Sequence, residues 1–589
     1  MDFIISLTLR AIQELYQEEV AEDAITLQET RKEFEGQITV VTFPFTRISK
    51  QSPEQTGRAL GEYFLTHSKE VKSYHVVKGF LNISLADSYW LSLFKEQILS
   101  DTFARFPQNG QHVMIEYSSP NTNKPLHLGH VRNNLLGFSI AEILEAAGYE
   151  VTKANLVNDR GIHICKSMLA WEKFGHGATP ESTGLKGDKL VGNYYVLFDQ
   201  HYKQQVNELK EAGLTEEEAK REAPLMQEAQ QLLRKWEGGD AAVWKLWNLM
   251  NGWVYDGFEE TYEEMGVTFD KIYYESKTYL LGKDIVKEGL DKGVFFRKED
   301  SSVWIDLTAE GLDEKLVLRG DGTSVYITQD LGTAQLKYDD FRMDKSIYVV
   351  GNEQDYHFKV LFEILKKLGK PWADGLFHLS YGMVDLPSGK MKSREGTVVD
   401  ADDLMADMVT TAKARTEELG KVEGFSDAEK TALYKMIGLG ALKYFLLKVE
   451  PKKRLLFDPN ESIDFQGHTG PFIQYTHARI KSVLAKGNYQ ETSPVILPAT
   501  LVDVERDLIK ELVKFPDIIQ SAAADYSPSV VANYIYDMAK WYNKFYHEAP
   551  ILKADDMGVK QFRLRLSAAT ADVVARGMRL LGIDVPERM

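Results

Sequence analysis

The chain of 589 residues contains a single cysteine, Cys165. One thiol excludes an internal disulfide and a zinc site built from several cysteines. A protein without disulfides is typical of a reducing compartment, so the cysteine content favours the cytoplasm.

Long apolar runs are also missing. No stretch of about 18 apolar residues occurs, so we expect no membrane-spanning helix. The opening segment MDFIISLTLRAIQELYQEEV lacks the basic residues that begin a secretory signal, and acidic residues follow it closely. We therefore expect a cytoplasmic protein that makes no membrane contact.

An excess of positive charge is lacking as well, because 70 Lys and Arg face 87 Asp and Glu, a formal net charge of −17. Averaged over the chain, this balance disfavours a broad nucleic-acid-binding surface. The charge is uneven, however: residues 451–589 are close to balance, and residues 1–450 carry almost all of the excess. If the protein binds nucleic acid, its C-terminal part offers the best local surface.

The length of the chain predicts two to four domains. Residues 1–108 are expected to form an α+β domain, with an opening amphipathic helix and a strand in GFLNISL (79–85). Residues 109–455 alternate strands with helices, which predicts a Rossmann-type parallel sheet. Segments with a different pattern, about 165–340, are expected to be inserted between two halves of that sheet. Residues 456–589 are expected to be all helical, so the predicted class is multidomain α/β.

Four sheet strands are expected in this domain. They are HVMIEYS (112–118), NLVND (155–159), SIYVVGN (346–352) and FHLSYGMV (377–384). The continuous apolar run of SIYVVGN is typical of a strand buried on both faces. Apolar residues at helical spacing follow the first strand, and Gly148 is expected to end that helix.

Residues 120–134, PNTNKPLHLGHVRNN, lie between the first of these strands and its helix. A loop in that position lies at the carboxyl edge of a parallel sheet, where ligands bind, and a helix N-terminus suits phosphate. His127 and His130 can donate hydrogen bonds to phosphate oxygens, Lys124 adds a cation, and Gly129 permits close approach of a nucleotide. The pattern indicates nucleotidyl transfer. In the alternative interpretation, His127 only caps the helix and His130 is a surface residue.

This segment resembles the first signature of class I aminoacyl-tRNA synthetases. The second signature of that class is a Lys-Met-Ser-Lys-Ser loop, and GKMKSREGT (389–397) resembles it at Lys390 and Met391. Ser393 replaces the second signature lysine, between Lys392 and Arg394. That replacement is typical of arginyl-tRNA synthetases, in which a lysine just upstream of the first signature supplies the missing charge. Lys124 occupies this position.

Further segments resemble the same family over most of the chain, in the same order. They are IEYSSPNTNKPLHLGH, RGDGTSVYITQDLG, VVGNEQDYHFK, FDPNESIDFQGHTGPFIQYTHAR and LLGIDVPERM, whereas 165–310 offers no match. The resemblance implies an arginine–tRNA ligase. Such an enzyme uses ATP with Mg²⁺ to form arginyl-adenylate from L-arginine, and transfers arginine to the 3′ adenosine of arginine tRNA. It also implies a tRNA-elbow-contacting domain at 1–108, a catalytic domain at 109–455 and an anticodon-binding domain at 456–589, in a chain expected to be a monomer.

The resemblance assigns roles residue by residue. Catalysis falls to Lys124, His127, His130, Lys392 and Arg394. ATP binding falls to His127, Gly129, His130, Lys390 and Met391. Arginine binding falls to Glu116, Ser118, Asn121, Tyr326, Asp330 and Gln354. Contact with tRNA falls to Phe80 and Asn82, and no metal site built by the protein is expected.

The assigned arginine pocket agrees with the chemistry of its substrate. A guanidinium is planar and always charged, so it favours carboxylates that accept in a fork geometry. Glu116 and Asp330 would supply two, and Tyr326 lies four residues before Asp330, on the same face if the segment is helical. The alternative is that both acids are ordinary surface residues.

Other candidates have competing interpretations. Phe80 and Asn82 either belong to a buried strand and its turn or contact an unpaired tRNA base. Most aromatics of NYIYDMAKWYNKFYHE (533–548) are expected in the core, with one or two available to an anticodon base. Asp159 and His163 are active-site candidates only, and with Cys165 they form too poor a ligand set for a metal.

Two other functions remain open at this point. One is another nucleotidyl-transferring enzyme with the same histidine pair, either a different class I synthetase or a small nucleotidylyltransferase. The other is a tRNA-binding relative without activity. Amino-acid-dependent charging of tRNA distinguishes all three.

Overall fold

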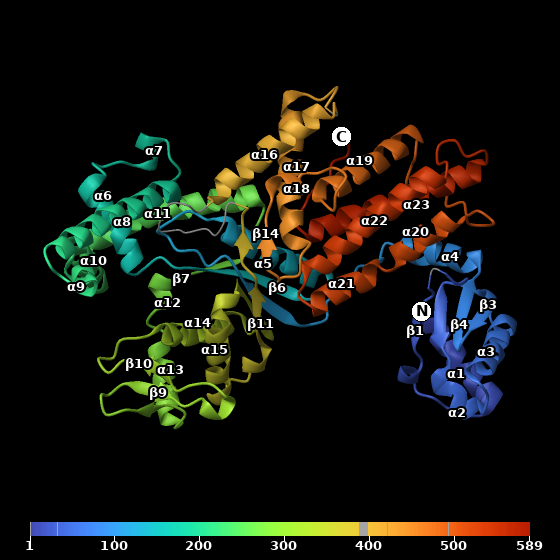
Figure 1. The fold of residues 1–589 in the computed structure, drawn as a ribbon, viewed down its shortest axis with the longest axis horizontal. Coiled ribbons are helices and arrows are strands. Elements are labelled where there is room, and N and C mark those ends of the chain that lie inside the picture. The colour runs from blue at the N-terminus through green and yellow to red at the C-terminus, as the bar shows by residue number, and fades with distance from the viewer. Residues whose placement is uncertain (1, 32, 388–398, 421, 493) are drawn as a thin grey trace. The chain divides into compact units, whose positions relative to one another are not determined.

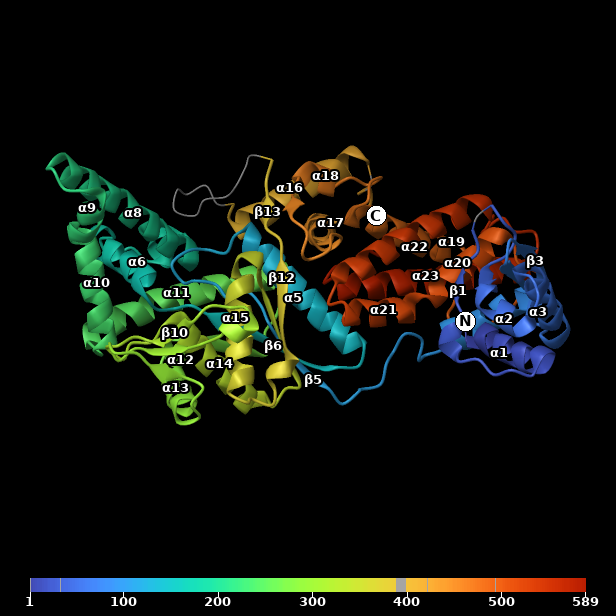
Figure 2. The same cartoon turned by 60° about the horizontal axis from the view of Figure 1, so that its bottom comes forward.

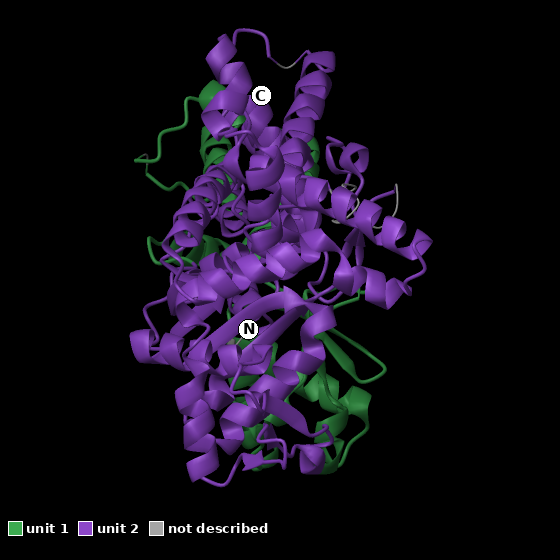
Figure 3. Cartoon of the chain, turned by 90° about the vertical axis from the view of Figure 1, so that its left-hand side faces the viewer, with its two compact units in different colours: residues 1–103, 483–515, 540–571 green, residues 104–482, 516–539, 572–589 purple. Residues whose placement is uncertain are grey.

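A computed structural model describes the chain except for residues 1, 32, 388–398, 421 and 493. The described residues divide into two compact units, coloured separately in Figure 3. Unit 1 comprises residues 1–103, 483–515 and 540–571, and unit 2 comprises residues 104–482, 516–539 and 572–589. The first 103 residues therefore share a unit with two C-terminal segments.

Unit 1 contains an antiparallel sheet of four strands in the order β1-β2-β4-β3. The strands are β1 (Leu27–Glu29), β2 (Ile38–Val41), β3 (Val71–Val77) and β4 (Phe80–Leu85). Helix α3 (Pro53–His67) packs on this sheet and on α1 (Asp2–Tyr16), and the short α2 (Thr46–Ser49) precedes it. The expected α+β character and the strand at 79–85 are confirmed.

C-terminal segments complete unit 1. Helix α4 (Asp87–Leu93) contacts α20 (Asp503–Val513), and Arg506 forms a 2.8 Å ion pair with Asp87. The ring of Phe94 lies 5.5 Å from that of Phe562. An ion pair and an aromatic contact therefore join segments that are more than 400 residues apart.

Unit 2 is built on a five-stranded sheet in the order β12-β11-β5-β6-β7, with every neighbouring pair parallel. The strands are β5 (His112–Glu116), β6 (Glu150–Val157), β7 (Lys271–Tyr274), β11 (Lys345–Gly351) and β12 (Leu376–Tyr381). The predicted parallel sheet is confirmed. Strand β7 falls within the interval expected as an insertion, so part of 165–340 belongs to the sheet itself.

Two helices connect neighbouring sheet strands, α5 (Leu128–Ala146) between β5 and β6 and α15 (Asp355–Lys367) between β11 and β12 (Figures 1 and 2). Leu136, Ile140, Ile143 and Leu144 of α5 are each at most 1% exposed, as their helical spacing predicts. Gly148 follows the helix with a φ of +96°, a conformation that glycine adopts without strain. The carboxyl ends of β5 and β11 therefore open onto the N-termini of these two helices.

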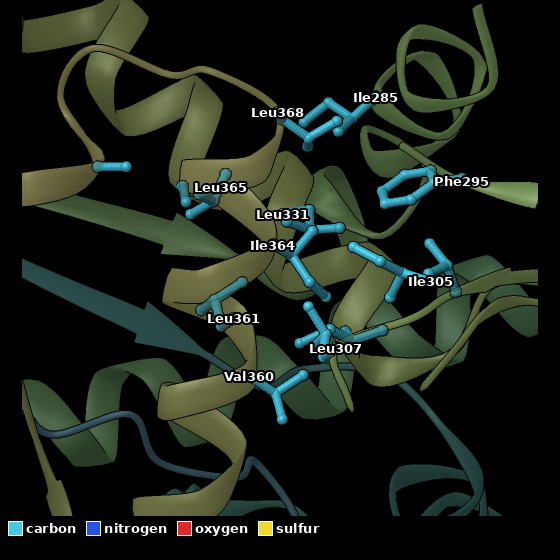
Figure 4. Packing of buried hydrophobic residues seen from close by; sticks show 14 of the residues in the cluster. Ile285, Phe295, Ile305, Leu307, Leu331, Val360, Leu361, Ile364, Leu365 and Leu368 are labelled. Carbon is cyan, nitrogen blue, oxygen red and sulfur yellow. The ribbon is translucent and has the colours of Figure 1, made fainter. Parts of the chain in front are cut away.

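The rest of 165–340 forms two substructures. The first is a helical bundle of α6 (Ile162–Phe174), α8 (Gly187–Glu211), α10 (Pro224–Glu237) and α11 (Ala241–Met265), with α7 (Pro180–Thr183) and α9 (Glu216–Glu222) at its turns (Figure 1). The second contains α12 (Glu275–Thr278), α13 (Gly282–Asp291), α14 (Tyr326–Phe341) and the antiparallel strands β8 (Phe296–Arg297), β9 (Val303–Ile305) and β10 (Lys315–Leu318). Its apolar core includes Phe295, Ile305 and Leu331, and it extends to Ile364 on α15 (Figure 4).

The described residues of 456–589 are helical, as predicted. Their helices are α18 (Pro459–Ser462), α19 (Gly470–Lys486), α20, α21 (Phe515–Ala524), α22 (Pro528–Glu548) and α23 (Met557–Leu580). Two further helices, α16 (Ala401–Glu418) and α17 (Asp427–Leu447), precede them within the interval 109–455. Two short parallel strands, β13 (Val384–Asp385) and β14 (Leu455–Leu456), pair with each other, and α16 and α17 lie between them in the chain. Among the described helices, none has the length and apolarity needed to span a bilayer.

Candidate active site

The two signature histidines cap helix α5 reciprocally. The backbone N–H of Gly129 donates to Nδ1 of His127 at 3.1 Å, and the backbone N–H of His127 donates to Nδ1 of His130 at 3.2 Å. Since both Nδ1 atoms accept, the proton of each neutral ring lies on Nε2. Both rings therefore keep an Nε2–H donor for a ligand at the helix N-terminus. Capping and catalysis, taken as alternatives from the sequence, are compatible in this geometry.

Both histidines stay neutral at physiological pH. Burial, together with the smaller effect of the Lys124 charge, lowers the pKa of His127 to about 4. Burial lowers the pKa of His130 well below its usual range, assisted by His127 and Lys124. Lys124 is thus close enough to act electrostatically on both rings.

Gly129 has a steric role that the sequence interpretation missed. A Cβ atom at this position would lie 2.9 Å from Cε1 of His127, closer than real Cβ contacts occur. The glycine therefore lets the His127 ring fold back over the first turn, in addition to leaving the backbone accessible.

The loop after β5 has a strained backbone. Ser118 and Ser119 adopt φ angles of +76° and +47°, a region that residues with a side chain seldom occupy. Their backbone N–H groups donate to Oδ1 of Asn133 at 2.6 Å and to Oδ1 of Asn155 at 3.1 Å. The Ser118 hydroxyl lies 2.7 Å from the Tyr262 hydroxyl. Strain held by several neighbours is typical of a functional site.

Asn133 was missed by the sequence analysis, although it lies on the signature helix. It is 5% exposed, and its Nδ2 donates to the carbonyl of Val349 at 2.7 Å and to the Tyr381 hydroxyl at 3.2 Å. One amide therefore ties the β5 loop to β11 and β12. A buried asparagine with every partner distant in sequence gives no local signal of this role.

Backbone pairing joins the chain just after the second signature to the first signature. His127 and Asp400 form an isolated antiparallel bridge. Two hydrogen bonds flank it, from Leu128 N–H to the Val399 carbonyl at 3.2 Å and from Ala401 N–H to the Leu126 carbonyl at 2.9 Å. Lys390, Met391, Lys392 and Arg394 themselves lie outside the described residues.

Glu116, the last residue of β5, is buried and forms an ion pair with Lys337 of α14. Lys337 is 1% exposed, and its Nζ lies 4.7 Å from the centre of the Tyr348 ring. The alternative that Glu116 is an ordinary surface acid is therefore wrong. Its negative charge is already partnered within the chain.

Asp330 has a partner as well. Its Oδ2 lies 2.6 Å from Nε2 of His357, which is on α15, three residues after Gln354. Tyr326 begins α14 and is 81% exposed, and Gln354 is exposed too. Both Tyr326 and Asp330 lie on one helix, as their spacing predicts. Asn121 is exposed in the loop after β5, where it pairs with Asn158.

Glu275 is another carboxyl that the sequence analysis missed. It begins α12, and its pKa is raised to about 7, chiefly by burial, with Arg160 lowering it and Asp159 and Asp330 contributing to the rise. Its proximity to Asp330 places it near the proposed arginine pocket. An isolated glutamate in a short polar segment carries no sequence signal of such an environment.

Asp159 and His163 have structural partners. The Asp159 carboxylate accepts hydrogen bonds from the Ser276 backbone and hydroxyl (2.8 and 2.7 Å) and from the Tyr255 hydroxyl (2.8 Å). His163 Nδ1 lies 3.0 Å from the Tyr195 hydroxyl. Among the described residues, no cluster of three His, Cys, Asp or Glu side chains is arranged to hold a metal ion.

The two residues assigned to tRNA differ in accessibility. Asn82 is 2% exposed, and its Oδ1 accepts from the Thr39 hydroxyl at 2.6 Å. Phe80 is half-buried, with its ring 5.6 Å from that of Phe43, which is 46% exposed. An aromatic pair therefore reaches the surface at Phe80, whereas Asn82 lies inside the sheet.

The aromatic segment 533–548 is divided in the same way. Tyr534, Tyr542 and Phe545 are at most 7% exposed and belong to the core. Tyr546 is 39% exposed, and Tyr536 and Trp541 are half-buried.

Comparison with known proteins extends these observations. Residues 96–458 match the family described as "tRNA synthetases class I (R), catalytic domain", and residues 473–589 match the "DALR anticodon binding domain". The chain is 57% identical to an arginine–tRNA ligase of Bacteroides thetaiotaomicron, over 100% of this chain and 99% of the relative. It is 52% identical to the arginine–tRNA ligase of Porphyromonas gingivalis, over 98% of each chain. The solved arginyl-tRNA synthetase of Thermus thermophilus superposes with a TM-score of 0.80 at 25% identity, covering 100% of both chains.

Proposed function

The chain belongs to the class I arginyl-tRNA synthetases, and from this premise we propose that it ligates L-arginine to arginine tRNA at the site around His127 and His130. Both the family match and the full-length relatives support an ATP-dependent ligase with an anticodon-binding domain. The observation that carries the assignment of the site is the reciprocal cap of α5. It supplies two neutral Nε2–H donors, a helix N-terminus and the nearby charge of Lys124 in one place.

In the first step, a carboxylate oxygen of arginine attacks the α-phosphorus of ATP. A bond from oxygen to phosphorus forms, the bond to the pyrophosphate oxygen breaks, and pyrophosphate leaves with its electron pair. The reaction needs no side-chain nucleophile. His127 and His130 donate hydrogen bonds to phosphate oxygens, and preorganised donors of this kind stabilise charge as it develops. Lys124, Lys392 and Arg394 supply the cations, and Gly129, Lys390 and Met391 line the nucleotide.

In the same proposal, arginine lies along the carboxyl edge of β5 and the N-terminal turn of α14. Asp330 and Glu116 face its cationic groups, with Ser118, Asn121, Tyr326 and Gln354 around it. Support comes from the strained Ser118 backbone and from the placement of Tyr326 and Asp330 on one helix. An uncharged analogue would lack the charge that these carboxylates favour, which disfavours it.

In the second step, the terminal adenosine of tRNA takes arginine from the adenylate and AMP leaves. We assign the anticodon to 456–589 and the tRNA elbow to 1–108, with Phe80 as a stacking residue. We assign Asn82 to tRNA contact as well. Because its amide is buried in the sheet, a base contacts it only if the residues packed around that strand move apart. Mg²⁺ enters as the complex with the phosphates of ATP, which its preference for oxygen ligands favours. We propose that the protein is a cytoplasmic monomer. Sedimentation of the purified chain tests the monomeric state.

The experiment is charging of arginine tRNA with radiolabelled arginine by wild type, Lys124→Ala and Lys287→Ala. Lys287 lies on α13 and serves as the matched lysine control. We expect Lys124→Ala to lower the turnover number by roughly 10²-fold, the scale of losing one preorganised donor, with little change in the arginine KM. Wild-type protein that charges no tRNA would contradict the function, and a Lys124 variant equal to the control would contradict the role of Lys124.

A second expectation concerns the order of events. Because the second signature lysine is replaced by Ser393, exchange of pyrophosphate into ATP should require tRNA. Robust exchange by the chain without tRNA would contradict it.

A further inference from the structure

Arg132 lies on helix α5, two residues after His130, and is 0% exposed. A buried guanidinium normally pairs with a carboxylate. The hydrogen bonds that the structure describes for Arg132 go instead to four main-chain carbonyl oxygens. Nη1 donates to Gly382 at 2.8 Å and to Met383 at 3.5 Å, and Nη2 donates to Pro451 at 3.2 Å and to Lys453 at 2.9 Å.

These carbonyls belong to two segments that run side by side. The Gly382 N–H donates to the Pro451 carbonyl at 2.9 Å, and the Leu455 N–H donates to the Met383 carbonyl at 3.1 Å. Strands β13 and β14 continue this pairing, and β13 packs beside α5 (Figure 2). Arg454 adds a hydrogen bond from Nη2 to Asp385 at 2.9 Å. Arg132 therefore joins α5 to both members of a small parallel sheet.

The close approach at Gly382 depends on the absence of a side chain. A Cβ atom there would lie 2.6 Å from the Lys453 carbonyl oxygen and 2.7 Å from the Arg454 nitrogen. These contacts are with backbone, which cannot move aside easily. Glycine thus permits the arrangement, and Arg132 holds it.

The attachment of residues 382–385 to α5 matters because of where these residues lie in the chain. Residues 382–385 come shortly before the second signature at 389–397, and Val399–Ala401, shortly after it, pair with Leu126–Leu128. The chain is therefore hydrogen-bonded to the first signature or to its helix α5 both before and after the second signature. On the first side Arg132 bonds directly to the carbonyls of Gly382 and Met383, next to the bond from Asn133 to Tyr381, whereas the bonds described on the second side join backbone groups.

We propose that Arg132 is a positioning residue for adenylate formation: it holds residues 382–385, which precede the second signature in the chain, against the helix that carries His127 and His130. The inference rests on the proposed function of those histidines. Arginine is needed here because only its planar fork can donate to carbonyls on two segments at once, whereas lysine presents a single ammonium. Burial lowers the pKa of Arg132 to about 10, so the group stays charged at neutral pH.

The test compares wild type, Arg132→Lys and Arg576→Lys in pyrophosphate exchange with tRNA present. Arg576 is the matched control, since its guanidinium on α23 also donates to a backbone carbonyl, that of Ala104 at 2.7 Å. Misplacing reacting groups by about 1 Å costs roughly 10²-fold in rate, and we expect Arg132→Lys to lose turnover on that scale. We also expect its KM for ATP to rise, with the KM for arginine within about threefold of wild type, because Asn133 and not Arg132 holds the arginine side of the site.

Arg576→Lys should keep wild-type turnover and KM values, whatever its melting temperature. The inference is overturned if Arg132→Lys exchanges pyrophosphate like wild type, or if it weakens ATP and arginine equally, as a general loss of structure does. Wild-type protein without activity would overturn the proposed function instead.

A second variant covers the case in which Arg132→Lys does not fold. Gly382→Ala keeps the guanidinium and displaces the same segment through its Cβ, so it should reproduce the selective effect on ATP. A folded Gly382→Ala variant with wild-type ATP kinetics overturns the inference.

Discussion

Glu116 at the end of β5 and Lys337 in the C-terminal half of α14 form an ion pair inside unit 2, and both side chains are at most 6% exposed. The pair joins the strand that precedes the first signature to the helix that carries Asp330. Opposite charges buried together are stable only as a pair, because each would otherwise lose its solvation without compensation.

We therefore expect Lys337→Met to destabilise the fold by about 3–5 kcal/mol, the cost of leaving one buried charge without its partner. The double variant Glu116→Gln/Lys337→Met should recover much of that loss, because it removes the charge that was left unpaired. Urea unfolding of Lys337→Met, Glu116→Gln and the double variant measures the coupling between the two side chains as a double-mutant cycle. Additive losses in the cycle would show that the two side chains do not stabilise each other.

Asp330→Asn tests the assignment of the guanidinium. The Asp330 side chain is 35% exposed and is bonded to His357. We therefore expect kcat/KM for arginine to fall by about 10- to 100-fold, which is at the lower end of the losses measured when one partner of a charge pair is removed. Citrulline, with a neutral ureido group, should be rejected less strongly by the variant, because the variant lacks one of the carboxylates that favour a cation over a neutral group. ATP binding should not change. Equal losses for arginine and citrulline would remove Asp330 from the guanidinium site.

The pair of signature histidines predicts an unusual pH dependence. Because the folded-state pKa of His127 is about 4, below its ordinary value of 6.5, the ring stays neutral down to about pH 5. Protonation favours the unfolded chain, so the stability of the fold should fall as pH drops from 6.5 toward 4. NMR of Cε1-labelled histidine, with His127→Asn to assign the resonance, tests this. A His127 signal that titrates near pH 6.5 would contradict a buried, accepting Nδ1.

Gly129→Ala tests the cap geometry. Alanine favours helices over glycine, which offsets the cap bond lost at His127, so we expect the variant to fold. Its Cβ would meet the His127 ring at 2.9 Å and displace it, which should lower turnover by roughly 10²-fold. Gly137→Ala is not a suitable control, because its Cβ would meet Tyr117 at 2.3 Å, whereas Gly252→Ala on α11 meets nothing within 4 Å. Normal turnover in Gly129→Ala would show that the ring position is not needed.

The local pattern of the sequence determined the elements and the chemistry of the first signature. Alternating strands and helices predicted the parallel sheet, helical spacing predicted the buried face of α5, and the order of the motifs predicted the family. These features are local because hydrophobic periodicity and a helix cap depend on residues within a few positions of one another.

Tertiary structure alone decided which distant residues complete the site. Nothing near Arg132 in sequence indicates the carbonyls of Gly382 and Pro451, and nothing near Glu116 indicates Lys337. The same holds for strand β7, which joins the sheet from within an interval that sequence pattern placed outside it. A buried charge is stable only where the fold brings it a partner, so the partner of such a group becomes visible only when the chain is folded.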